Sequence, residues 1–298
     1  MTDFLQLTVT GLVVGGVYSL VALGFVLIYK ASDVINFAQG QLLMAGAYVA
    51  LALVTAFKVP TVPFFLLAVL VTLVFSFLLG MIIERAVLRP FIGEPIISVI
   101  MATIGLSSVL GGLIQVFWGT ETRTFPPIFP QEPVRLGEVV VSQVYLWSLG
   151  VAVALLVIFS LFFKYSSVGI AMRATADDQQ AALSMGISVN KIFAWAWAIS
   201  AVVSALGGVL LGNINGINVS LGSLGLRVLP VAILGGLDSI PGAIVGGFTI
   251  GLLENLAGGY LDPIFGGGVK ELAPFVVLVL ILMIKPYGLF GKEIIERV

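Results

Sequence analysis

The sequence predicts an all-α fold, a polytopic bundle of transmembrane helices with about eight or nine spans, some of them broken or short. Two observations on composition and one on pattern indicate it. Of the 298 residues, 59% are apolar and only 10% are charged, whereas soluble domains carry about 25% charged residues. The apolar residues are gathered into runs without the period-two alternation of barrel strands. Because every backbone N–H and C=O needs a partner in lipid, we expect these runs to be helices of one transmembrane domain, residues 1–298.

The apolar runs define the expected spans, since each span needs about 20 apolar residues to cross roughly 30 Å of hydrocarbon. The first run is too long for the core of a signal peptide and lacks a basic leader, so we expect it to be retained as a span. The runs cover residues 4–29, 41–57, 62–83, 96–118, 143–163, 190–212, 224–237, 240–258 and 272–285.

Two places interrupt this series. The run 224–237 is short, contains Pro230 and ends in two glycines. It is either one arm of a tight hairpin or a broken helix that lines a pathway, as transporters use. Residues 30–41, a polar stretch between apolar runs, leave the same alternatives open.

The two interrupted regions resemble each other. Residues 36–42 and 218–224 are identical at three of seven positions, the asparagine, the glycine and the final leucine. Downstream of each, an apolar segment carries a glycine and then a glutamate: Gly80 with Glu84, and Gly251 with Glu254. The sequence therefore suggests an internal repeat, as many transporters have.

The distribution of lysine and arginine predicts the orientation, because cytoplasmic loops are enriched in them. We expect the N-terminus and residues 119–142 outside and the C-terminus inside, in a multi-pass protein of the inner (plasma) membrane. On the cytoplasmic side this places Lys30, Arg85, Arg89, Lys164, Arg173, Lys191, Lys285, Lys292 and Arg297. The other side keeps Lys58, Arg123, Arg135 and Lys270, and Arg227 is ambiguous.

Residues 164–191 form the one long polar stretch on the side expected to be cytoplasmic. Thr175 followed by Asp178 is typical of a helix start, and Asp177 suits the positive end of the helix dipole. Gly186 suits a helix end that needs positive φ. We expect a helix of about ten residues here, between two spans.

The composition of that helix favours a protein partner. We expect Ala182 and Met185 to be exposed apolar positions. A helix that rests on a membrane surface would instead present a basic face opposite bulky apolar residues.

Several classes of function are excluded. The chain has no cysteine and no histidine, which removes disulfides, thiol chemistry and most zinc and general-base sites. A net charge of -1 gives no support to nucleic-acid binding. Because we find no nucleophile–base pair, paired aspartates or metal-ligand pattern, we expect no enzyme, cofactor or metal site. No Gly-rich loop with a nucleotide-binding lysine is present either, so we do not expect ATP hydrolysis by this chain.

Three stretches resemble the permeases of branched-chain amino acid ABC transporters. They are GGVYSLVALG at 15–24 running into VINFAQG at 34–40, the loop 169–186, and LGGLDSIPGA at 234–243. Residues 180–186, QAALSMG, also resemble the Glu-Ala-Ala-x-x-x-Gly loop of bacterial ABC importer permeases, with Gln180 in place of the Glu. The Ile-x-Leu-Pro ending of that loop is not found here. The resemblance covers nearly the whole chain.

The resemblance implies a permease subunit of an ATP-binding-cassette importer for branched-chain or other small neutral amino acids. Close relatives in the family carry urea or aromatic carboxylates. It also implies four kinds of neighbour: a second, similar permease in a heterodimer, two ATPase subunits, a periplasmic solute-binding protein and the lipid bilayer. Residues 164–191 would be the coupling loop, contacting the ATPase through Arg173, Asp177, Asp178, Gln180, Ala181, Ala182, Met185 and Gly186.

Polar residues in or beside the apolar runs are candidates for the translocation pathway. Buried amides cost free energy unless they meet water, a ligand or each other, so Asn36, Gln39 and Gln41 either line the path or bond among themselves. The full candidate set is Ser19, Asn36, Gln39, Gln41, Asn215 and Asn218.

An ion-coupled secondary transporter of a small neutral solute is the alternative interpretation. Such a transporter needs ionisable groups in the membrane, usually paired. Only Glu84, Glu254, Arg227 and Asp238 come near the apolar runs, and we expect all four close to run ends.

Overall fold

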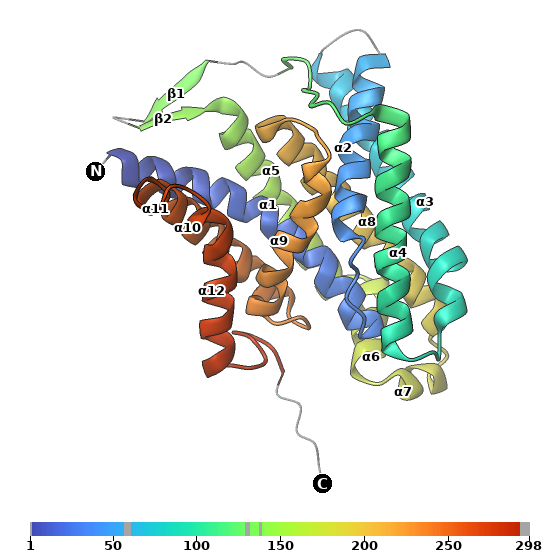
Figure 1. The fold of residues 1–298 in the computed structure, drawn as a ribbon. Helices are drawn as coiled ribbons and strands as arrows, with labels where there is room; N and C mark the ends of the chain where they lie inside the picture. Colours follow the sequence, from blue (N-terminus) through green and yellow to red (C-terminus); the bar gives the residue numbers. More distant parts are fainter. Residues whose placement is uncertain (1, 57–60, 129–131, 137–138, 293–298) are drawn as a thin grey trace.

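The computed structural model describes residues 2–56, 61–128, 132–136 and 139–292 and shows a helical bundle with one β-hairpin (Figure 1). The first half contains α1 (Thr2–Ser32), α2 (Gln39–Ala56), α3 (Val62–Ile83), η1 (Glu84–Leu88), η2 (Arg89–Phe91), α4 (Ile96–Trp118), β1 (Pro133–Leu136), β2 (Val139–Ser142) and α5 (Gln143–Tyr165). The second half contains α6 (Ser167–Asp177), α7 (Gln179–Ser184), α8 (Val189–Asn215), α9 (Ser220–Gly235), α10 (Ile240–Tyr260), α11 (Asp262–Phe265) and α12 (Val269–Ile284).

The expected all-α polytopic bundle is confirmed. Within the described ranges, seven helices are long and apolar enough to cross a membrane: α1, α2, α3 with η1 and η2, α4, α5, α8 and α10. Helices α9 and α12 have 16 residues each. At 1.5 Å per residue each is about 24 Å long, which is shorter than the hydrocarbon core of a bilayer.

The bundle has two different ends (Figure 1). Antiparallel strands β1 and β2 lie at one end, with Pro133 opposite Ser142, and we call this the hairpin end. Helices α6 and α7 lie at the opposite end, which we call the α7 end. The sequence pattern did not predict the hairpin, which follows the Pro-rich segment after α4.

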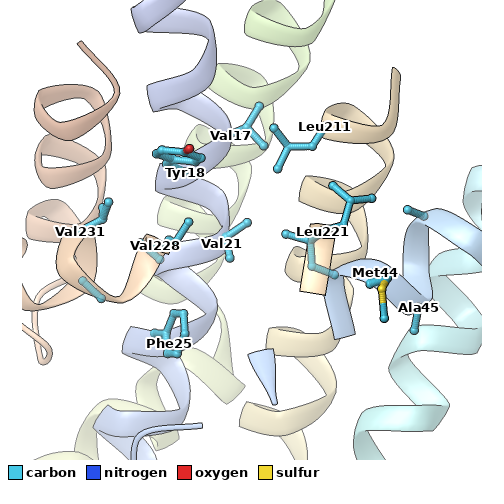
Figure 2. Close-up of a cluster of buried hydrophobic side chains, with 14 of the residues drawn as sticks. Val17, Tyr18, Val21, Phe25, Met44, Ala45, Leu211, Leu221, Val228 and Val231 are labelled. Atoms are coloured by element: carbon cyan, nitrogen blue, oxygen red, sulfur yellow. The ribbon is translucent and has the colours of Figure 1, made fainter. Parts of the chain in front are cut away.

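Helices α1 and α8 form the centre of the bundle, and most of their residues are buried. In Figure 2, Tyr18, Val21 and Phe25 of α1 lie among Val228 and Val231 of α9 and side chains of α2 and α8. By contrast α3, α4 and α5 expose most of their apolar side chains. In a protein with several apolar spans, such a surface is the one expected to face lipid or another membrane subunit.

Glycines allow the central helices to approach closely. The Cα of Gly15 in α1 lies against Gly251 in α10, and a Cβ at either residue would overlap the backbone of the other helix. Gly80 in α3 lies in the same way on the backbone of Trp197 and Ala198 in α8. Small residues at such crossings are the usual basis of helix packing in membranes.

For the short run 224–237, the structure shows the first of the two alternatives, a tight hairpin between two helices. Helix α9 continues through Pro230, and a tight turn over Gly236–Ser239 leads into α10. Gly236 has φ of 105°, which only glycine adopts readily. The last carbonyls of α9, those of Leu234 and Gly235, accept hydrogen bonds from the N–H groups of Leu289 and Phe290 at 2.8 and 3.0 Å.

The expectation that four ionisable residues lie near run ends was wrong for three of them. The run 62–83 continues to Phe91 through the π-helix η1, so Glu84 lies inside a span. Glu254 is six residues from the end of α10, and Arg227 is the eighth of the 16 residues in α9. Hydropathy averages hide single charges inside a span when their neighbours are strongly apolar. Asp238 does lie at a run end, in the α9–α10 turn.

The two segments that resemble each other adopt the same local structure. Asn36 Oδ1 accepts from Ala38 N–H at 2.9 Å and Asn218 Oδ1 accepts from Ser220 N–H at 3.0 Å, each just before a helix. The shared glycines, Gly40 and Gly222, are in direct contact. Helix α2 therefore begins beside the first half of α9.

The contact of Gly40 with Gly222 generates the first prediction. A Cβ at Gly40 would overlap the Gly222 carbonyl oxygen, so we expect Gly40→Ala to destabilise the chain by about 1–3 kcal/mol, the usual cost of overpacking. The measurement is the midpoint of thermal unfolding of the purified chain in detergent. Gly150→Ala in α5 is the control, because an added Cβ there meets no atom within 4 Å. Equal midpoints for the two variants would contradict this packing.

Candidate functional site

A cluster of polar side chains holds the break between α1 and α2. Helix α1 ends at Ser32, and Asp33 turns the chain with a φ of 54°. The Asn36 Nδ2 group donates to Gln39 Oε1 at 3.0 Å. Gln39 Nε2 in turn donates to Ser204 Oγ of α8 at 2.5 Å. Both amide side chains are fully buried.

The cluster also reaches the centre of α1. Ser200 Oγ of α8 lies 2.9 Å from the Gly24 carbonyl and 3.1 Å from Gln39 Oε1. Gly24 leaves the space for this contact, because a Cβ there would overlap the Gln39 amide. On the α4 side, Thr103 Oγ1 accepts from Phe37 N–H at 3.4 Å. The polar atoms at this break are thus bonded within the protein, as buried polar groups must be.

Gln41 differs from the other two amides. Within the residues that the structure describes, its Oε1 is buried without a hydrogen-bond partner. Its side chain lies between Gly111 of α4 and Gly222 of α9, since a Cβ at either glycine would meet the Gln41 amide. An unsatisfied buried oxygen costs about 1–3 kcal/mol, so Gln41 is the candidate most in need of a further partner.

The structure places the remaining pathway candidates apart from this cluster. Ser19 Oγ lies 2.8 Å from the Gly15 carbonyl and 3.0 Å from the Ile244 carbonyl, at the crossing of α1 and α10. Asn218 Oδ1 accepts from the N–H of Ser220, the first residue of α9, and Asn215, at the end of α8, is exposed. The six candidates therefore occupy three separate places.

The polar loop 164–191 forms two helices, α6 and α7, where one of about ten residues was expected. Thr175 is no cap: it is buried within α6, and its hydroxyl donates to the Ala171 carbonyl at 2.9 Å. Asp178 itself begins α7, because its Oδ1 accepts from Gln180 N–H at 2.8 Å and Ala181 N–H at 2.9 Å. The capping pattern was correct in kind but assigned one turn too early.

The end of α7 agrees with the sequence, and its apolar face does so in part. Gly186 has φ of 83°, as expected for a helix end. Met185 is 82% exposed, but Ala182 is buried and not available to a partner. Leu183, 57% exposed, takes its place beside Met185. Ala181 and Gln180 are also exposed. The free surface of α7 thus combines the apolar side chains of Leu183 and Met185 with polar ones such as Gln180, while Ala182 is buried against its own chain.

Polar contacts fasten α6 to three other elements. The Arg173 guanidinium donates to the carbonyls of Phe163 and Lys164 at the end of α5. Asp177 pairs with Lys292 at 2.8 Å, and the Lys292 ammonium lowers the pKa of this carboxyl. Lys292 N–H donates to Asp238 Oδ2 in the α9–α10 turn at 3.2 Å. The Asp238 carbonyl also accepts from Lys30 Nζ of α1 at 3.1 Å.

Three ionisable residues within the long apolar stretches of the chain have partners too. Glu84 pairs with Arg89 at 2.8 Å and Arg227 with Glu271 at 2.8 Å. Glu254, buried in α10, accepts a hydrogen bond from the Tyr18 hydroxyl at 3.3 Å. In the part of the chain that the structure describes, no group of three or more acidic residues is close enough to hold a metal ion.

Comparison with known proteins gives the family. A family model described as branched-chain amino acid transport system / permease component matches residues 7–285. The chain belongs to this family. The high-affinity branched-chain amino acid transport system permease protein BraD of Pseudomonas aeruginosa is 33% identical, over 99% of this chain and 98% of the relative. The corresponding permease protein LivH of Escherichia coli K12 is 30% identical over the same shares.

A more distant relative and a solved structure agree. The probable branched-chain amino acid transport permease protein LivH of Methanocaldococcus jannaschii is 30% identical, over 92% of this chain and 88% of the relative. PsaBC from Streptococcus pneumoniae, solved in complex with Fab, has a similar fold. Its TM-score is 0.51 at 17% sequence identity, over 94% of this chain and 91% of the solved chain. The permease family thus accounts for the full length of the chain and not for one segment.

Sequence reasoning missed the partners of the buried amides in this permease. Ser200 and Ser204 of α8 complete the Gln39 cluster, but serines in apolar runs usually bond to their own backbone and so attract no attention. Their spacing of four residues, which puts both on one helix face, was the available signal. Tyr48 of α2 was also missed. Its hydroxyl is buried without a partner among the described residues.

Gln39 generates the second prediction. Gln39→Leu leaves Asn36, Ser200 and Ser204 without their shared partner, so we expect a loss of about 1–3 kcal/mol in stability. The measurement is again the thermal midpoint in detergent. Gln115→Leu, at an exposed position of α4, is the control and should leave the midpoint unchanged. If Gln39→Leu abolished uptake with an unchanged midpoint, the amide would contact the solute and would not serve packing.

Proposed function

We propose that this chain is the membrane permease subunit of an ATP-driven importer for branched-chain or other small neutral amino acids. Membership of the branched-chain permease family over residues 7–285 carries the proposal. Relatives from two bacteria, matched along 99% of this chain, are named for branched-chain amino acid transport. The ion-coupled alternative is not favoured by any of these relatives.

The proposal includes partner subunits. Transport against a gradient needs an energy source, and the sequence contains no nucleotide-binding loop of its own. ATP hydrolysis would therefore occur on two separate ATPase subunits. A second permease of the same family would complete the path through the membrane, and a periplasmic binding protein would deliver the solute.

The surface of α7 supports ATPase docking at this end of the bundle. Met185 and Leu183 are exposed apolar side chains on a short, capped helix. In the proposed complex, α7 is held by the ATPase while α6 transmits the movement. Arg173 connects α6 to α5, and Asp177 connects it through Lys292 to the α9–α10 turn. Of the expected coupling residues, Ala182 would act only by packing within the chain.

Within the permease, the path would follow the face of α2 that carries Gln41. Within the described part of the chain the Gln41 oxygen is unpaired, and the side chain lies at the junction of α2, α4 and α9. Asn36 and Gln39 would then stabilise the start of α2 beneath the path. Ser19, Asn215 and Asn218 are weaker candidates, since Ser19 is bonded within a helix crossing, Asn218 is bonded to Ser220, and Asn215 is exposed at the end of α8.

We also infer nine crossings and an inverted internal repeat. Helices α9 and α12 would cross where the surrounding protein covers their short length. The first unit would be α1 to α3 and the second α8 to α10. Three features support this: matching asparagine turns before α2 and α9, the antiparallel contact of Gly40 with Gly222, and the reciprocal packing of α1 on α10 and of α3 on α8.

The third prediction tests coupling. Ala181 is exposed on α7, so Ala181→Trp adds bulk where the ATPase would dock without disturbing the chain's own core. We expect loss of ATPase co-purification, or of ATP-dependent leucine uptake in proteoliposomes, with normal membrane insertion. The control is Val140→Trp on the exposed hairpin at the other end. Normal coupling in the Ala181 variant, with the ATPase bound, would refute the assignment.

The fourth prediction tests orientation. Because the chain has no cysteine, a single introduced one reports its own side of the membrane. We expect Gln179→Cys, at the start of α7, to be labelled by an impermeant maleimide only after the cytoplasmic side is opened. Val140→Cys should be labelled in intact cells with a permeable outer membrane. The reverse pattern would overturn the proposed orientation.

A further inference from the structure

A cavity of about 600 Å³ opens at the hairpin end, between the end of α2 and the segment that follows α4. One wall is apolar and the other carries hydroxyl groups and a guanidinium. We call it the Arg123 cavity, and its lining is Leu51, Ala52, Thr55, Ala56, Trp118, Thr122, Arg123 and Thr124.

Arg123 is held in place through its backbone. Its N–H donates to the Ile217 carbonyl at 2.8 Å, and Ile217 N–H donates back to the Arg123 carbonyl at 2.7 Å. This two-residue bridge fastens the segment after α4 to the turn before α9. Yet among the described residues the Arg123 guanidinium has neither an ion pair nor a hydrogen bond. Arg123 is exposed and belongs to the lining of the cavity, and an unpaired cation on a fixed backbone at such a place is suited to an anionic ligand.

A buried polar group without a partner among the described residues lies next to this cavity. The Tyr48 ring is 5.7 Å, centroid to centroid, from the ring of Trp118 in the cavity lining. Tyr48 is fully buried, and its hydroxyl has no partner within the described part of the chain. On α2 it precedes Leu51 and Thr55 by about one and two turns. Tyr48 thus packs against the cavity lining through Trp118.

Gln41 is another buried polar residue on the same helix, α2. It precedes Tyr48 by seven residues, which puts both side chains on the same face of α2, about 10 Å apart along the axis. The two side-chain atoms that the described structure leaves buried and unpaired are Gln41 Oε1 and the Tyr48 hydroxyl. Both therefore lie on one line that starts at the Arg123 cavity.

We propose that the Arg123 cavity is the first solute site of the permease and that Arg123 binds the solute's carboxylate there. This inference rests on the proposed function and adds which group of the amino acid is recognised. A guanidinium and a carboxylate form two parallel hydrogen bonds, which gives both affinity and orientation. The apolar side chain of the solute then lies against Leu51, Ala52 and Trp118. From there the Tyr48 hydroxyl and Gln41 are the next polar partners along α2.

The experiment uses cysteine protection in the assembled complex. Thr55 lines the cavity and is exposed, so Thr55→Cys can be labelled by a maleimide. The binding protein is left out, because its own specificity would mask that of the cavity. We expect leucine and 4-methylpentanoate, which carry a carboxylate, to slow the labelling. We expect 3-methylbutylamine, which lacks one, to have no effect. Thr122→Cys reports the same cavity if the first variant yields too little complex.

Two further variants show whether Arg123 is responsible. In the Arg123→Gln background we expect the concentration of 4-methylpentanoate that halves the labelling rate to rise about tenfold or more, the effect of losing a charged hydrogen-bond partner. Arg123→Lys should retain part of the protection, since lysine keeps the positive charge but cannot form the two parallel hydrogen bonds of a guanidinium. Val140→Cys, outside the cavity, should be labelled at the same rate throughout.

Other outcomes overturn the proposal. Equal protection by the amine and the acid, or protection unchanged in Arg123→Gln, would remove the carboxylate role. Protection by phosphatidylglycerol vesicles, with none by 4-methylpentanoate, would make the cavity a lipid headgroup site. ATP-dependent leucine uptake by the complex with its binding protein is measured in parallel. If the complex takes up leucine but 4-methylpentanoate does not slow the labelling, the solute site in the cavity is refuted and the proposed function stands. If the complex takes up no amino acid, the proposed function is refuted.

Discussion

The hydrogen bonds of the Gln39 side chain are the interaction on which the rest of the arrangement depends. A chain that stops and restarts a helix inside an apolar bundle leaves backbone groups without helical partners, and such groups are costly away from water. The N–H groups of Ala38 and Phe37 donate to Asn36 Oδ1 and Thr103 Oγ1. Gln39 holds this arrangement by bonding the side chains of Asn36, Ser200 and Ser204 within 2.5 to 3.1 Å. Once the break is stabilised, α2 can begin beside α9, and Gly40 then meets Gly222.

The close contact of α2 with α9 determines what can lie along α2. With glycines on both α4 and α9 facing it, the Gln41 amide occupies space that any larger side chain would fill. Its oxygen has no hydrogen-bond partner among the residues that the structure describes. Tyr48, seven residues further along α2, packs against Trp118 and likewise has a buried polar atom without a partner among the described residues. Packing requirements and polar requirements thus conflict on this one face, and native proteins retain such conflicts mainly at functional positions.

The sequence predicted well what depends on composition and local chemistry. Long apolar runs gave the spans, Gly186 gave the end of α7, and the Asn36 and Asn218 segments gave two matching turns. The sequence did not predict features that depend on contacts between helices distant in the chain. The burial of Ala182 and the pairing of Gln39 with Ser204 involve α8, which follows in the sequence and leaves no local trace. Asp178 was recognised as a capping residue but at the wrong position, because two consecutive helices share one polar stretch.

The bonds at the α7 end explain how a small docking surface could act on a distant path. Lys292 bridges Asp177 of α6 and Asp238 of the α9–α10 turn, and Asp238 is also bonded to Lys30 of α1. The two Lys292 contacts are exposed and individually weak, and the Lys30 contact is part-buried, so all three can rearrange more easily than the fully buried Gln39 cluster. A shift of α6 would then move the lower end of α9 relative to a fixed start of α2. Gly222, which packs against Gln41, lies at the other, N-terminal end of α9, so a rigid movement of α9 would carry the shift to this amide.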